Sequence, residues 1–223
     1  MKDEIRIIID DLVLNAEVGM PLLSLLKEWK IDIPTLCYHS QLGPLHRCSL
    51  CIVEVRRSGE WKAKHACMLA CTSGLEIRTI SSDIHRLRAR AARILLTRGP
   101  FAKPSVEIIL HRILSAAKAA GIPDDSQFLP IEIPEESISK DLLDQDPTAQ
   151  MRQQGCVLCG QCVEMCKKTG NNFLTFLGRG NKLRISYVNT AATCGKCRAC
   201  SHVCPTGYIH STGQAAFAAK LYR

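Results

Sequence analysis

Residues 156–166 read CVLCGQCVEMC, and residues 194–205 repeat the same spacing as CGKCRACSHVCP. In each run, three cysteines at three-residue spacing on a tight loop can ligate three corners of one four-iron cluster, while the fourth points away and ligates the other cluster. Zinc sites are the alternative, but zinc knuckles use Cys-x2-Cys pairs rather than triples. The spacing therefore predicts two four-iron clusters, the first on Cys156, Cys159, Cys162 and Cys204, and the second on Cys194, Cys197, Cys200 and Cys166.

The first third of the chain holds a second cysteine group, made of Cys37, Cys48, Cys51, Cys67 and Cys71. A long first loop, a close pair and a remote fourth thiolate are suited to a two-iron cluster held in a loop at the edge of a small sheet. The spacing is similar to the plant-type run, but its first gap has ten residues instead of four. Spacing alone leaves both Cys67 and Cys71 open as the fourth ligand.

The composition favours a metal-binding protein. The chain has 223 residues, 13 cysteines and a formal net charge of +8. Because the cysteine count is odd and no apolar signal-peptide core follows Met1–Glu4, we expect a cytoplasmic protein rather than a secreted disulfide protein. No apolar run approaches the roughly 18 residues of a membrane span. Three clusters of charge about −2 each would lower the net charge to roughly +2, so the basic excess is largely a counter-charge for the cofactors.

The pattern of the first 80 residues predicts a small α+β domain. The β-branched run Ile5–Ile9, a turn at Asp10–Asp11 and the run Leu12–Ala16 predict a hairpin. A helix is expected to start at Pro21 and to reach Trp29. Later strands are expected at residues 52–56, around Trp61 and at residues 75–79. This order predicts a β-grasp [2Fe-2S] ferredoxin-like domain over residues 1–80.

Residues 81–150 hold no cysteine and are expected to form a helical connector and an acidic linker. Ser81 and Ser82 are good N-cap residues for a helix that Gly99-Pro100 breaks, and a second helix is expected from about Pro104 to Ala120. Residues 123–147 are rich in proline and acid. Residues 151–223 are expected to form a double [4Fe-4S] bacterial-ferredoxin-like domain with a hairpin of residues 173–176 and 183–187.

A basic run extends from Arg86 to Lys103 in the connector. It lacks the interleaved aromatic side chains that nucleic-acid sites carry. We therefore expect a docking face, or packing against the acidic linker, and no nucleic-acid partner.

The residues around the first cysteines carry a family resemblance. Cys37-Tyr38-His39 and residues 48–55, CSLCIVEV, resemble the N-terminal cluster segment of the large iron–sulfur subunit of complex I. The segment also occurs in iron-only hydrogenases and in the small diaphorase subunit of NAD-linked nickel–iron hydrogenases. In that family the fourth ligand lies in an Ala-Cys segment followed by a glycine, which matches Ala66-Cys67 and Gly74. The resemblance thus implies one [2Fe-2S] cluster on Cys37, Cys48, Cys51 and Cys67, with Cys71 as the spare thiol.

Size and layout resemble the small diaphorase subunit most. The resemblance implies an electron-relay subunit of a hetero-oligomer, placed between a flavin-bearing NAD(P)H-oxidising partner and a second catalytic partner such as a nickel–iron hydrogenase. Family members commonly carry a His-x3-Cys-x2-Cys-x5-Cys site between the two cysteine groups. The matching stretch, residues 98–120, has no cysteine, so that cluster is expected to be absent. Either the remaining clusters lie close enough to exchange electrons directly, or a partner's cluster fills the gap.

The sequence contains no phosphate-binding loop, nucleophile–base arrangement or flavin signature, so we expect the chain to catalyse nothing alone. Two alternative functions remain open. An iron–sulfur subunit like that of succinate dehydrogenase or fumarate reductase has a similar module order, but the ten-residue first gap and the two complete cysteine runs argue against it. A non-catalytic iron–sulfur sensor would bind nucleic acid through the run Arg86–Arg98.

Overall fold

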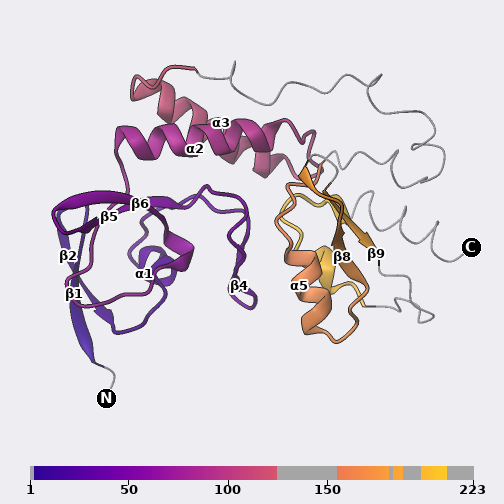
Figure 1. The fold of residues 1–223 in the computed structure, drawn as a ribbon, viewed down its shortest axis with the longest axis horizontal. Coiled ribbons are helices and arrows are strands. Elements are labelled where there is room, and N and C mark those ends of the chain that lie inside the picture. The colour runs from indigo at the N-terminus through magenta and orange to yellow at the C-terminus, as the bar shows by residue number, and fades with distance from the viewer. Residues whose placement is uncertain (1–2, 125–154, 181–182, 188–196, 210–223) are drawn as a thin grey trace, which may run out of the picture.

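The computed structural model describes residues 3–124, 155–180, 183–187 and 197–209. A mixed sheet with one short helix comes first, two longer helices follow, and a smaller part built of helices and a hairpin comes last (Figure 1). The elements of the first part are β1 (Glu4–Ile9), β2 (Leu12–Glu17), α1 (Leu22–Glu28), β3 (Tyr38–His39), β4 (Gly43–Pro44), β5 (Ile52–Arg57), β6 (Glu60–His65), the short 3-10 helix η1 (Ala66–Met68) and β7 (Glu76–Arg78).

Five strands form one sheet in the order β2-β1-β7-β5-β6. β1 runs antiparallel to β2 and parallel to β7. Side chains alternate along β1, so Ile7 and Ile9 are fully buried while Ile8 between them is 37% exposed. The four leucines of α1 pack in the same core as these two isoleucines. The hairpin, the helix and the three later strands expected from the sequence are confirmed.

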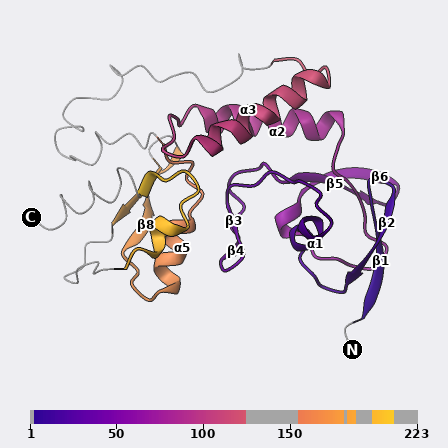
Figure 2. The same cartoon turned by 180° about the vertical axis from the view of Figure 1, so that it is seen from behind.

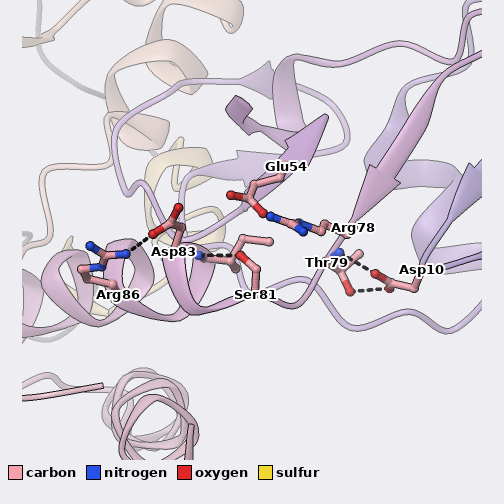
Figure 3. Close-up of polar contacts among 8 residues, drawn as sticks. Asp10, Glu54, Arg78, Thr79, Ser81, Asp83 and Arg86 are labelled. Atoms are coloured by element: carbon pink, nitrogen blue, oxygen red, sulfur yellow. Dashed lines mark hydrogen bonds and ion pairs between the residues drawn. The ribbon is translucent and has the colours of Figure 1, made fainter. Parts of the chain in front are cut away.

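Polar contacts tie the sheet together where the chain leaves it. The β1–β2 turn places Asp10 and Asp11 at φ of 48° and 67°, a left-handed pair that suits a tight hairpin turn. The Asp10 carboxylate accepts hydrogen bonds from the Thr79 amide at 2.7 Å and from its hydroxyl at 2.6 Å (Figure 3). Arg78 pairs with the buried carboxylate of Glu54 on β5. The end of β7 is therefore fixed to its neighbouring strands just before the connector begins.

The connector consists of α2 (Ser82–Leu96) and α3 (Pro104–Ala119), which pack against each other and extend from the sheet to the last part of the chain (Figures 1 and 2). Ser81 caps α2, because its Oγ accepts the amide of Ile84 at 3.1 Å (Figure 3). Pro104 occupies the first turn of α3, where its missing N–H is not needed. Both helices are confirmed near their expected bounds.

The basic run on the connector makes contacts within the chain. Arg86 pairs with Asp83 on the same helix (Figure 3). Arg88 donates to the carbonyl oxygen of Ile52, and Arg93 pairs with Asp124 at 3.2 Å. The last contact joins α2 to the start of the acidic segment, which from residue 125 onward lies outside the described residues.

The last part contains α5 (Gln161–Lys168), β8 (Leu174–Leu177), β9 (Arg184–Tyr187) and α6 (Ala199–His202). β8 and β9 form the expected hairpin. The short strands β3 and β4, η1, α5 and α6 were not expected from the sequence. No helix among the described residues combines the length and the apolar composition needed to cross a membrane.

Candidate iron–sulfur centres

Four cysteines of the first group meet at one end of the sheet. Cys37 precedes β3, Cys48 and Cys51 lie in the loop before β5, and Cys67 lies in η1 after β6. All four are buried. The loops approach one another because the amide of Ala66 donates to the carbonyl of Cys51 at 2.8 Å. The fold thus brings together four thiols that the sequence spreads over 31 residues.

The four thiols form two hydrogen-bonded pairs, Cys37 with Cys48 and Cys51 with Cys67. The hydrogen bond from its partner lowers the pKa of Cys37 to about 5 and that of Cys51 to about 7. The pKa values of Cys48 and Cys67 are raised, first by the same bonds and then by burial. One sulfur of each pair is therefore poised to be a thiolate, the form that binds metal.

Backbone amides surround the first pair. The amides of Arg47 and Cys48 donate to Cys37 Sγ at 3.4 and 3.5 Å, and the amide of Leu36 donates to Cys48 Sγ at 3.5 Å. His46 and Ser49 on this loop adopt left-handed φ angles of 58° and 52°. Amide donors to sulfur stabilise the anionic form of a thiolate site.

Cys71 packs in the same core as Cys51 and Cys67, but its thiol belongs to neither pair. It is fully buried in the core of the sheet, where its amide donates to the carbonyl of Met20 at 2.8 Å and its carbonyl accepts the amide of Gly19. Burial raises the pKa of its thiol. Its surroundings are those of a small apolar side chain in a core.

In the last part of the chain, Cys156, Cys159, Cys162 and Cys204 are buried together. Burial is the largest cause that raises the pKa of Cys162, and the charges of Cys159, Cys156, Cys204 and Cys200 raise it further. Burial also raises the pKa of Cys156 to about 11 and that of Cys159 to about 12. These four cysteines therefore lie near one another, and Cys166 and Cys200, which spacing assigns to the second cluster, pack in the same part of the chain.

The second predicted four-iron set is described in part. Cys166 is buried, and its Sγ accepts the amide of Phe173 at 3.2 Å. Cys200 is half-buried and Cys197 is exposed. Cys194 lies outside the described residues.

The donor set of the first group fits a two-iron cluster. Within the described ranges, no three His, Cys, Asp or Glu side chains surround a position for a single metal ion. A two-iron cluster takes four thiolates, two on each iron. Two neighbouring pairs of buried cysteines supply this arrangement.

The two cysteine groups adjoin each other. Cys159 belongs to the same buried cluster as Cys37 and Cys48, and the sulfur of Cys37 is among the charges that raise its pKa. Both views place the β3–β4 pair on the side of the sheet that faces α5 (Figures 1 and 2).

Side chains from both sides fix this contact. Gln161, which is 3% exposed, donates its Nε2 to the carbonyl of Leu36 at 3.0 Å and to that of Tyr38 at 3.5 Å. The Arg47 guanidinium lies 4.1 Å from the ring centroid of Phe176. Gln161 therefore holds the backbone on either side of Cys37.

The sequence gives no sign that Gln161 and Arg47 make this contact between the two cysteine groups. Gln161 lies inside the second CxxC of its run, and a polar side chain there gives no sign of whether it faces solvent or another loop. Its partners are 123 and 125 residues away, and only the folded structure shows them. Of the histidines near the first loop, His65 contacts Ser49 Oγ at 3.4 Å.

Comparison with known proteins agrees with this donor chemistry. Residues 2–82 match the model of a 2Fe-2S iron-sulfur cluster binding domain, and residues 155–208 match that of a 4Fe-4S dicluster domain. The chain is an iron–sulfur protein with these two domains. It is homologous to an iron–sulfur subunit of NADH-quinone oxidoreductase.

The sequence relatives of this iron–sulfur protein are much longer. It is 28% identical over 209 residues to an NADH-quinone oxidoreductase subunit of Rhizobium meliloti, covering 93% of this chain and 24% of that protein. It is 26% identical over 212 residues to the mitochondrial NADH dehydrogenase [ubiquinone] iron-sulfur protein 1 of Solanum tuberosum, covering 94% and 28%. The chain thus spans about a quarter of the length of these relatives.

A solved structure has the same fold. It is a chain of the NAD+-reducing [NiFe]-hydrogenase in the H2-reduced state, with a TM-score of 0.64 and 20% sequence identity. The alignment covers 91% of this iron–sulfur protein and 85% of that chain.

Proposed function

We propose that this protein is the electron-transfer subunit of a larger NAD(P)-linked oxidoreductase. It relays electrons through one [2Fe-2S] and two [4Fe-4S] clusters between a flavin-bearing NAD(P)H-oxidising subunit and a second catalytic subunit, such as a nickel–iron hydrogenase. The adjacency of two buried cysteine groups, with Cys159 packed beside Cys37 and Cys48, is the observation that carries this proposal. The names of the relatives and of the hydrogenase neighbour support the class of complex.

The spacing, the contacts and the family resemblance together support a set of ligands. The two-iron cluster takes Cys37 and Cys48 on one iron and Cys51 and Cys67 on the other, since these are the two neighbouring pairs. The first four-iron cluster takes Cys156, Cys159, Cys162 and Cys204, and the second takes Cys166, Cys194, Cys197 and Cys200.

When bound, each cluster accepts and releases a single electron. The chain's own residues then have three tasks. The buried loops exclude water from the sulfurs, the amides of Arg47 and Cys48 donate to Cys37 Sγ, and Gln161 keeps the two ligand loops in contact. Hydrogen bonding and burial of this kind set the potential of an iron–sulfur site.

The connector adds no cluster of its own in this proposal. Its buried side chains Phe101, Val106, Leu110 and Ile113 pack in the same cluster as Cys37, Cys48 and Cys159. With no cluster in the connector, electrons would pass between the two-iron and the first four-iron site either directly or through a cluster that a partner supplies. We also propose domain limits at residues 80 and 150 and a cytoplasmic location.

The first test is anaerobic iron and sulfide analysis of the purified chain. About ten irons per chain are expected, since one two-iron and two four-iron clusters require them. Two or three zinc ions per chain instead would overturn the proposal.

Two cysteine variants test the ligand set. Cys67→Ala is expected to abolish the spectrum of the two-iron cluster, because it removes one of four thiolates and supplies no other donor. Cys71→Ala is the matched control, and it is expected to keep that spectrum because the Cys71 thiol pairs with none of the four proposed ligands. The reverse result would assign the fourth ligand to Cys71.

The partners are tested by an anaerobic pull-down from native cells. Co-purification of a flavin subunit with a nickel–iron pair is expected for a hydrogenase relay. A flavin subunit with another oxidoreductase would keep the relay and change its destination. Recovery without a redox partner would contradict the proposal.

A further inference from the structure

The connector helix α2 places one arginine behind the two-iron site. Arg88 donates from Nε at 3.1 Å and from Nη2 at 2.6 Å to the same acceptor, the carbonyl oxygen of Ile52. Ile52 directly follows Cys51, so this bidentate contact fixes a guanidinium next to a ligand loop. The side chain is half-buried.

The positive charge of Arg88 is not cancelled by an ion pair. No carboxylate in the described part of the chain forms an ion pair with it, although Asp10 and Asp32 are near enough to raise its pKa. Asp10 already accepts two hydrogen bonds from Thr79, and Asp32 pairs with Arg112 at 2.7 Å.

Arg88 lies within the electrostatic reach of Cys51. Burial lowers the pKa of Arg88 to about 10, and the charge of Cys51 acts in the opposite direction. At neutral pH the guanidinium therefore keeps its charge. The neighbouring His85 has its pKa lowered by burial and then by the charge of Arg88.

We propose that Arg88 is a positioning residue of the connector that raises the reduction potential of the [2Fe-2S] cluster. The inference rests on the proposed function, because it takes Cys51 as a ligand. Reduction adds one electron to a site that is already anionic on four thiolates. A fixed cation beside Cys51 stabilises the reduced form more than the oxidised form, and the water-poor surroundings weaken its screening. A chain without a cluster in its connector would thus use the connector to tune the cluster in the sheet domain.

The test is a redox titration of the whole chain, followed by the paramagnetic resonance signal of the reduced two-iron cluster. Arg88→Gln keeps one donor for the Ile52 carbonyl and removes the charge. It is expected to disfavour reduction about tenfold, which corresponds to a fall in midpoint potential of 59 mV for one electron. Arg88→Met is a second neutral variant with the same expectation, and it serves if Arg88→Gln fails to assemble the cluster.

Two further variants separate charge from structure. Arg88→Lys keeps the charge and is expected to restore most of the wild-type potential. Arg86→Gln is the matched control on the same helix, because Arg86 is exposed and paired with Asp83. It is expected to leave the potential unchanged.

Several outcomes would overturn the inference. These are a wild-type potential in both neutral variants with their clusters assembled, an equal fall in Arg86→Gln, or a full fall in Arg88→Lys. The midpoint of the four-iron signals in the same samples is an internal reference, and a parallel shift there would also overturn it. Absence of any two-iron signal in the wild-type protein would refute the proposed function instead, so the two failures are distinguishable.

Discussion

Replacing Gln161 with leucine removes the buried amide that joins the two cysteine groups. The wild-type Nε2 donates to the carbonyl of Leu36 at 3.0 Å, and leucine leaves that carbonyl without this donor inside a dry contact. A buried polar group that loses its partner costs about 1–3 kcal/mol. Because the bond joins two parts of the chain, we expect this cost to appear as local opening rather than as global unfolding. Opening at the contact should be roughly 5- to 150-fold more populated.

Hydrogen exchange of the cluster-loaded protein under anaerobic conditions measures this opening. The amides of residues 36–39 are expected to exchange faster in Gln161→Leu, while those of β1 and β5 keep the wild-type rate. Gln161→Glu should have a larger effect, since it directs a carboxylate at two carbonyl oxygens. Lys168→Met is the matched control, because its ammonium donates to the Gln41 carbonyl on the exposed rim of the same contact. Exchange at residues 36–39 that stays at the wild-type rate in Gln161→Leu would refute the reasoning.

Three further predictions concern polar contacts elsewhere in the molecule. Asp10→Ala removes two hydrogen bonds to Thr79, at 2.7 and 2.6 Å. It should lower the free energy of unfolding, measured by denaturant titration, by about 1–3 kcal/mol. An unchanged unfolding midpoint would show that solvent replaces both bonds. Ser81→Ala removes the cap of α2 and should cost about 1 kcal/mol, measured by the same titration with Ser82→Ala as the control. Lys103→Gln removes a cation that donates to the Cys204 carbonyl at 2.9 Å, and it should lower the midpoint of the first four-iron cluster. Its effect should be smaller than that of Arg88→Gln on the two-iron cluster, because Lys103 is exposed; a rise would contradict the reasoning.

Local sequence patterns predict the strands, turns and helices that are determined by interactions between residues close together in the chain. The alternation in Ile5–Ile9, the turn at Asp10–Asp11 and the serines before α2 each act over a few residues. These signals predict the order of the longer strands and helices up to α3, but not β3, β4, η1, α5 or α6.

The contacts between distant segments could not be predicted in this way. β3 and β4 are only two residues long, and their pairing depends on the turn between them rather than on a hydrophobic pattern. Gln161 and Arg88 bond to main-chain carbonyls 125 and 36 residues away, and a carbonyl carries no sequence signature. The cysteine spacings predict which thiols would bind metal, but only the fold shows that Cys159 packs with Cys37 and Cys48.

We propose that one chain holds a two-iron cluster beside a four-iron cluster, because Cys159 packs in the same buried cluster as Cys37 and Cys48. Paramagnetic resonance of the anaerobic, fully reduced protein tests it most directly. We predict a two-iron signal whose spin relaxation is accelerated by a neighbouring reduced four-iron cluster, and we expect the acceleration to weaken in Gln161→Leu. A two-iron signal with the slow relaxation of an isolated cluster, in a protein with all of its iron in place, would contradict the claim.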